Sequence, residues 1–133
     1  MDSVPVARAL FLCDAVQADA ATGNVTLVNC FNRLVATAFP CTNRPFSVVA
    51  FLSDGFGGYR VGVQITHLES GRTVYDHRHT LSFPDRLYEI RYRLQVTGCV
   101  FPEPGVYEVQ MLVGREVVAD TRFLLRPPEA NHG

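Results

Sequence analysis

Apolar and polar positions alternate along short segments of this chain, and glycine, proline, asparagine and aspartate separate the segments. Valine, isoleucine, threonine, tyrosine and phenylalanine are frequent within them, which is typical of β-strands. Apolar residues nowhere keep the i, i+3, i+4, i+7 spacing of an amphipathic helix over a long window. The pattern therefore predicts an all-β protein of about eight strands without a long helix.

The expected strands cover residues 6–16, 25–35, 46–53, 59–68, 72–83, 87–96, 106–113 and 116–125. Alternation is clearest in 87–96, where Tyr88, Ile90, Tyr92, Leu94 and Val96 share one face and Glu89, Arg91, Arg93 and Gln95 the other. One apolar and one charged face is typical of an antiparallel sheet that covers a core on one side. We expect a two-sheet antiparallel β-sandwich. Residues 1–126 would form its single domain, and 127–133 a frayed C-terminal tail.

One hairpin is defined in register by its sequence. Glu69-Ser70-Gly71 fits a three-residue loop in which the glycine adopts the left-handed conformation. This loop pairs Leu68 with Arg72, Ile65 with Tyr75, Val63 with His77 and Val61 with His79. A two-residue loop would shift the register by one and place apolar residues beside charged ones.

Composition narrows the function classes. Net charge is −1 with 19% charged residues, so a nucleic-acid-binding surface is not expected. The amino terminus has no basic region before a long apolar run, so we expect neither a signal peptide nor a membrane span. The four cysteines have no Cys-x-x-Cys spacing, which favours free thiols in a cytoplasmic protein. Cys13 and Cys30 lie in apolar segments and are expected in the core.

A turn near the carboxyl end carries a structural motif. The order Pro104-Gly105-Val106-Tyr107, then an alternating strand, a glycine turn and a last strand, resembles the closing hairpin of immunoglobulin-like and fibronectin-like sandwiches. In that arrangement the tyrosine hydroxyl bonds back to the preceding corner. Pro104, Gly105 and Tyr107 are therefore the expected structural corner.

A wider resemblance covers nearly the whole chain. It is carried by Leu12-Cys13-Asp14-Ala15, by residues 28–34 (VNCFNRL), by Ala38-Phe39-Pro40 and by residues 101–107 (FPEPGVY). These segments resemble a family of small bacterial proteins known as a domain of unknown function. The resemblance implies a bacterial, cytoplasmic domain of the sandwich type, and it supplies no catalytic residue.

His77 and His79 are the candidate metal ligands. Two histidines two positions apart on a strand project from one face and can bind zinc or copper with a third ligand. His67 falls on the same face but four to six positions along the strand, and Asp76 points the other way. A metal-binding protein or a metal-dependent hydrolase is therefore the alternative function. No cofactor and no catalytic residue is expected.

Exposed apolar segments point to a partner instead. Phe56 lies at the tip of the glycine loop 54–58, and the first and last strands carry Leu10, Leu12, Phe123 and Leu125. Terminal strands this apolar could add to another protein or to a second copy. The charged row Glu89, Arg91, Arg93 is either a solvated face or a face for an acidic partner. The preferred function is a non-catalytic protein-binding or self-assembling module.

Overall fold

The computed structural model describes residues 4–42 and 44–129, and in this part of the chain every regular element is a β-strand. This confirms the all-β prediction. The strands are β1 (Val6–Ala18), β2 (Val25–Cys30), β3 (Arg33–Val35), β4 (Cys41–Thr42), β5 (Phe46–Ser53), β6 (Gly57–His67), β7 (Thr73–Phe83), β8 (Ile90–Val96), β9 (Val100–Phe101), β10 (Gly105–Val113) and β11 (Glu116–Arg126). No helix in the described residues is long and apolar enough to cross a membrane.

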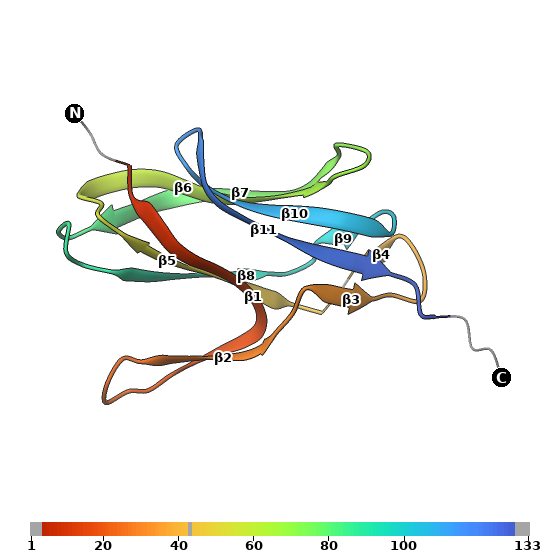
Figure 1. Cartoon of the computed structure of the whole chain (residues 1–133), viewed down its shortest axis with the longest axis horizontal. Coiled ribbons are helices and arrows are strands. Elements are labelled where there is room, and N and C mark those ends of the chain that lie inside the picture. Colours follow the sequence, from red (N-terminus) through yellow and green to blue (C-terminus); the bar gives the residue numbers. More distant parts are fainter. Residues whose placement is uncertain (1–3, 43, 130–133) are drawn as a thin grey trace.

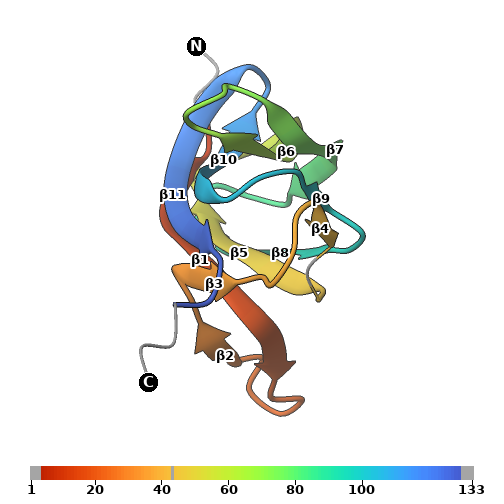
Figure 2. The same cartoon turned by 90° about the vertical axis from the view of Figure 1, so that its right-hand side faces the viewer.

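The strands form three sheets. A four-stranded sheet has the order β2-β1-β5-β8, a five-stranded sheet the order β3-β11-β10-β6-β7, and β4 pairs with β9. Figures 1 and 2 show the two larger sheets as layers, with β5 and β8 in one and β6 and β10 in the other. The expected all-antiparallel arrangement is wrong at one place, because β3 runs parallel to β11.

One core lies between the two larger sheets. Val48, Ala50 and Leu52 of β5 enter it from one sheet, and Val61 and Val63 of β6 from the other, all fully buried. These residues alternate along their strands, as a face packed against a core requires. Aromatic rings fill the end near the corner, where Tyr107 and Phe123 stack at 5.5 Å. Burial of this apolar surface is the main stabilising contribution.

The β6–β7 hairpin confirms most of the predicted register. Ile65 lies opposite Tyr75, Val63 opposite His77 and Val61 opposite His79. The register then shifts by one, so that Thr66 lies opposite Thr73 and the predicted Leu68–Arg72 pair does not form. The backbone N–H of His67 donates to the Arg72 carbonyl instead, because a β-bulge after Ile65 absorbs one residue.

Two strand boundaries differ from the prediction. Residues 25–35 form β2 and β3 rather than one strand, because the chain passes between the sheets after Cys30, where the Leu124 N–H donates to the Asn32 carbonyl. The strand expected over 87–96 begins at Ile90. The side chain and the carbonyl of Asp85 accept the N–H groups of Leu87 and Tyr88 in a turn, so Tyr88 is half exposed and not in the core.

Candidate binding face on the curled sheet

The end of the β1–β2 hairpin bends out of the plane of its sheet and forms an arm, defined here as residues 14–29. The Phe31 N–H donates to the Leu12 carbonyl, which makes Cys13 and Cys30 a non-hydrogen-bonded pair. The Asp19 N–H donates to the Asn24 carbonyl, which makes Ala18 and Val25 another such pair, five positions along. In a regular antiparallel ladder, hydrogen-bonded and non-hydrogen-bonded pairs alternate, so two non-hydrogen-bonded pairs lie an even number of positions apart. Cys13 and Ala18 are five positions apart, so this alternation slips once between them.

The slip is at Asn29, which has a left-handed φ of 55°. Asparagine tolerates this conformation better than most residues. Its side-chain amide donates to Asp14 Oδ2 at 2.6 Å, and Arg44 Nη2 donates to Asp14 Oδ1 at 2.9 Å. The Asn29 hydrogen bond and the Arg44 guanidinium hold the pKa of Asp14 below its usual range. These three side chains fix the bend at the base of the arm.

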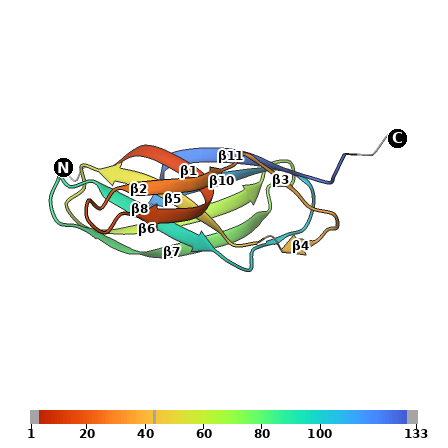
Figure 3. The ribbon, with the colours of Figure 1, turned by 90° about the horizontal axis from the view of Figure 1, so that it is seen from below.

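The arm folds over the outer face of its own sheet. Arg91 Nη1 on β8 donates to the carbonyl of Gly23 in the arm's turn at 3.3 Å. Figures 1 and 3 show β2 on the side of β5 and β8 that faces away from the other large sheet. A cleft of about 860 Å³ lies at this end, between the turn and the β7–β8 connection. It is lined by Thr22, Gly23, Asn24, Val25, Ser82, Pro84, Leu87, Tyr88, Glu89, Ile90 and Arg91.

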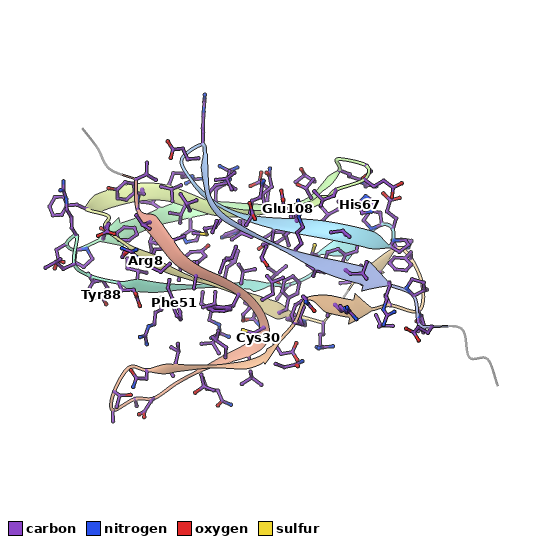
Figure 4. The ribbon with its side chains drawn as sticks, viewed as in Figure 1. Arg8, Cys30, Phe51, His67, Tyr88 and Glu108 are labelled. Atoms are coloured by element: carbon purple, nitrogen blue, oxygen red, sulfur yellow. The ribbon has the colours of Figure 1, made fainter. Side chains whose placement is uncertain are left out.

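The outer face below the arm is both apolar and cationic. We call it the binding face, and it comprises Phe11, Val49, Phe51, Arg91 and Arg93. Phe11 and Phe51 meet edge to face at 6.0 Å, and the Arg91 guanidinium lies 5.5 Å from the centre of the Phe51 ring. A cation–π contact of this kind stabilises by about 0.5–1 kcal/mol at an exposed site. Figure 4 shows Phe51 on the arm side of the sheet and Cys30 at the base of the arm.

The arginines of this face differ in their partners. Arg91 Nε lies 3.6 Å from Glu89 Oε1, and its side chain is 39% exposed. Arg93 Nε donates only to Ser47 Oγ, at 3.4 Å, and no carboxylate of residues 4–42 or 44–129 lies within salt-bridge distance of it. Guanidinium groups bind carboxylates through two parallel hydrogen bonds. Arg93 therefore has unused capacity for an acidic group.

The strand that carries both arginines is an edge. β8 pairs with β5 on one side and has no strand neighbour on the other in the described part of the chain. An edge strand leaves every second N–H and carbonyl group without a ladder partner. An extended segment can pair with these groups while its side chains contact the adjoining face.

The sequence signal for this face lay in β5. Phe46, Val48, Ala50 and Leu52 enter the core, but Val49 between them is also only 1% exposed. A strand that is apolar on both sides is typically covered on both sides. The run from Phe46 to Leu52 therefore indicated a second covered face, although it did not identify the arm that covers it.

The predicted interface residues on the terminal strands are buried in the chain's own core. Leu12, Phe123 and Leu125 are at most 3% exposed, and Leu10 is partly buried against the same core. β1 lies between β2 and β5, and β11 lies between β3 and β10, so neither terminal strand is an edge. Leu12, Phe123 and Leu125 therefore expose almost no surface, whereas Leu10 keeps part of its side chain exposed.

Phe56, in contrast, is 64% exposed. Its N–H donates to the Tyr59 hydroxyl at 3.1 Å, which fixes the backbone of the loop. The Asp54 N–H donates to the Arg86 carbonyl, so this loop lies beside the β7–β8 connection that carries the exposed Leu87. Phe56 therefore lies at the same end of the molecule as the cleft.

His77 and His79 lie side by side on β7, with ring centroids 5.3 Å apart. His77 is exposed, whereas His79 stacks on Tyr92 at 5.3 Å, and its Nδ1 is buried with no hydrogen-bond partner among the described residues. In the described residues, no group of three or more His, Cys, Asp or Glu side chains is arranged to hold a metal ion. The two histidines thus lack a third ligand there.

His67 has a structural position that the sequence did not reveal. It is 2% exposed and packs against Tyr107 at the corner rather than beside His77. Its Nε2 lies 3.0 Å from the Pro104 carbonyl oxygen, and its Nδ1 accepts the Ser70 N–H at 3.2 Å. A carbonyl only accepts, so Nε2 carries the proton. His67 follows Val61, Val63 and Ile65 on the buried side of β6, which directs it toward this contact.

The predicted corner is present as a hydrogen-bonded unit. The Tyr107 hydroxyl donates to the Glu103 carbonyl at 2.5 Å. Gly105 has φ 135°, and a Cβ there would lie 2.7 Å from His67 Nε2. Only glycine fits both the conformation and the close approach. Pro104 supplies the carbonyl that His67 contacts.

The described structure is thus that of an all-β protein in which the β1–β2 arm lies over the outer face of the four-stranded sheet, with an aromatic–arginine face beneath the arm. The chain belongs to a family of unknown function (DUF6941), whose model matches residues 8–126. This agrees with the resemblance to a domain of unknown function. No curated protein matches the sequence.

Proposed function

We propose that this protein is a non-catalytic binding module that takes up an extended, acidic segment of a partner protein on the binding face. The observation that carries the proposal is the position of Arg93, which faces the arm side of an edge strand without a carboxylate partner among the described residues. The segment would pair with β8 and place acidic side chains on Arg93 and Arg91.

Apolar contacts would give the segment its anchor. Phe51 lies on β5, the neighbour of β8, and is partly exposed, so an apolar side chain of a bound strand would contact its ring, with Phe11 packed behind it on β1. Because side chains of a strand alternate in direction, acidic and apolar residues two positions apart would meet the arginines and Phe51 on the same face. A protein ligand fits this pattern better than a nucleic acid, since the net charge of the chain is −1.

Three finer features remain proposals alongside this function. An immunoglobulin-like relationship is supported by the Tyr107–Glu103 corner and the β10–β11 hairpin that follows it. A cytoplasmic location is supported by four free cysteines. Bacterial origin rests on the resemblance of the sequence segments alone.

The test is selection of peptides from a random display library on the full chain. We expect selected peptides to carry Asp or Glu alternating with apolar residues. The double variant Arg91→Glu/Arg93→Glu should lose their binding. Arg72→Glu is the matched control, because Arg72 is exposed on the β6–β7 turn away from this face. Selected peptides without acidic residues, or equal binding to the double variant, would contradict the proposal.

Light scattering at micromolar concentration distinguishes a second copy from a foreign partner. A dimer that Arg91→Glu/Arg93→Glu dissociates would show that the face binds another copy of this chain, which overturns the foreign-partner form of the proposal. A monomer that binds the selected peptides supports it.

A further inference from the structure

Two cysteines face each other at the base of the arm. Cys13 on β1 lies directly opposite Cys30 on β2, and both thiols are free. The residues next to the cysteines carry the ladder hydrogen bond, 3.0 Å long, from the Phe31 N–H to the Leu12 carbonyl. Cys13 and Cys30 are therefore a non-hydrogen-bonded pair of the antiparallel ladder. At such a site the Cα atoms of opposite residues lie about 4.5 Å apart and their side chains share one face.

This spacing suits a disulfide bond. Cross-linked cysteines have Cα atoms roughly 4.4–6.8 Å apart, so a bond here requires rotation of the side chains and no movement of the strands. Cys13 Sγ now donates to the Ala15 carbonyl at 3.4 Å, and rotation about its Cα–Cβ bond would release it toward Cys30. We propose that Cys13 and Cys30 are a modification site that forms a reversible intrachain disulfide with a low-molecular-weight disulfide as oxidant.

The two thiols differ in access, which sets the order of the steps. Cys30 is exposed, whereas Cys13 is fully buried, and burial raises the pKa of its thiol. The Cys30 thiolate attacks the reagent, here oxidised glutathione, forms a mixed disulfide and expels one glutathione thiolate. The Cys13 thiolate then attacks Cys30 Sγ and expels the second glutathione. The oxidant takes both electrons, and the two cysteine protons end on the two reduced glutathiones.

The second cysteine pair of the chain provides an internal comparison. Cys41 lies opposite Phe101, and Cys99 lies two residues before Phe101, just outside β9, so the two cysteines are diagonal to each other rather than opposite. Diagonal neighbours across a sheet are roughly 7–8 Å apart, which suits a disulfide less well than a directly opposite pair does. Burial also raises the pKa of Cys99 to about 11, which disfavours its thiolate. We therefore expect Cys13 and Cys30 to form a disulfide before Cys41 and Cys99 do.

A bond at this position would restrain the arm. β2 pairs only with β1 in the described sheet, and beyond the bend the arm is held by its own ladder and by the Arg91–Gly23 hydrogen bond. A covalent link next to the Asp14–Asn29 bend would limit how far the arm can open from the binding face. The effect on ligand binding rests on the proposed function, whereas formation of the disulfide does not.

The experiment treats the full chain with oxidised glutathione and measures intact mass and a peptide map. We expect the intact mass to fall by two hydrogens through a Cys13–Cys30 link in the wild type and in Cys41→Ser. Cys13→Ser should stop at a glutathione adduct on Cys30, and Cys30→Ser should form no link. Cys30 is exposed, so Cys30→Ser keeps the fold even if Cys13→Ser does not.

A persistent adduct on Cys30 of the wild type, or a Cys41–Cys99 link that forms first, would overturn the proposal. Amide hydrogen exchange in β2 should slow in the oxidised form and recover on reduction. Unchanged exchange would contradict the claim that the disulfide restrains the arm. Peptides from the display selection are then compared on both forms. A disulfide that forms in a protein that binds no peptide refutes the proposed function and leaves the modification site standing.

Discussion

The hydroxyl of Tyr107 donates a hydrogen bond of 2.5 Å to the backbone carbonyl of Glu103. Both groups lie at the entrance to β10, and the Tyr107 ring is fully buried between His67 and Phe101. The hydrogen bond therefore ties the corner to a side chain that the core already holds. Burial raises the pKa of the Tyr107 hydroxyl, so the group stays protonated and remains a donor at neutral pH.

Tyr107→Phe should lower the free energy of unfolding by about 1 kcal/mol. The ring packs as before, but the Glu103 carbonyl loses its donor. Urea denaturation measures the change. Tyr75→Phe is the control, since the structure shows no hydrogen bond from the partly buried Tyr75 hydroxyl to any described residue, and its midpoint should stay close to that of the wild type. An unchanged midpoint for Tyr107→Phe would show that the Tyr107–Glu103 hydrogen bond does not stabilise the protein.

Gly105→Ala should be the more damaging change at the same corner. The added methyl would lie 2.7 Å from His67 Nε2, and φ 135° is unfavourable for any residue with a Cβ. Strain and overpacking together should cost about 2–4 kcal/mol. Gly58→Ala on β6 is the control, because its Cβ would find its nearest neighbour, Thr80 Cγ2, at 3.8 Å. Thermal unfolding of both variants tests this, and equal melting temperatures would contradict it.

The sequence predicted the elements that depend on local pattern. β5 (Phe46–Ser53) has the expected bounds, and the hairpin register holds from Val61 to Ile65. In both cases the period-two alternation and the turn residues determine the outcome. The corner at Tyr107 was predictable for the same reason, since its donor and acceptor lie four residues apart.

The arm was not predictable, because it depends on one backbone conformation. The left-handed Asn29 shifts the ladder alternation and turns β2 over the outer face, and no apolar pattern records that shift. Cys30 was expected in the core and is exposed for this reason. The parallel pairing of β3 with β11 joins residues far apart in the chain, as Leu125 lies opposite Leu34, and local pattern carries no information on such contacts.

Asp14→Asn should loosen the base of the arm. The charged carboxylate binds the Asn29 amide and Arg44, and the neutral amide binds both more weakly. The site is near the surface, so the expected loss is about 0.5–1 kcal/mol. It should show as faster amide exchange in β2 at neutral pH, with β6 and β10 unchanged as the internal control. Faster exchange throughout the chain would indicate general destabilisation instead.

Acidification gives the same result in the wild type. The pKa of Asp14 is lowered from its ordinary 3.8 in the folded protein, because the Asn29 hydrogen bond and Arg44 favour the carboxylate. The folded state therefore binds the proton less readily than the unfolded state. The stabilisation is complete above pH 3.8 and is lost as pH falls through the folded pKa. The difference in exchange between wild type and Asp14→Asn should shrink in that range, and a constant difference would refute this origin.

His79 should make stability fall at mildly acidic pH. Burial, then the nearby His77 and Arg60, lower its pKa from the ordinary 6.5. The unfolded chain binds a proton at this histidine more readily than the folded chain does. Stability is therefore full above pH 6.5 and declines as pH falls from 6.5 toward the folded pKa.

His79→Phe should reduce this decline, because a phenylalanine keeps the stack on Tyr92 and has no proton to take up. The urea midpoint of the wild type should drop between pH 7.5 and about 5.5, and that of His79→Phe should drop less. His77→Phe is the matched control, since His77 is exposed on the same strand. The His77→Phe variant should keep most of the decline in stability, because burial lowers the pKa of His79 more than the nearby His77 does. If His77→Phe abolishes the decline and His79→Phe does not, the titrating group is the exposed histidine, and the buried position of His79 has no part in the pH dependence.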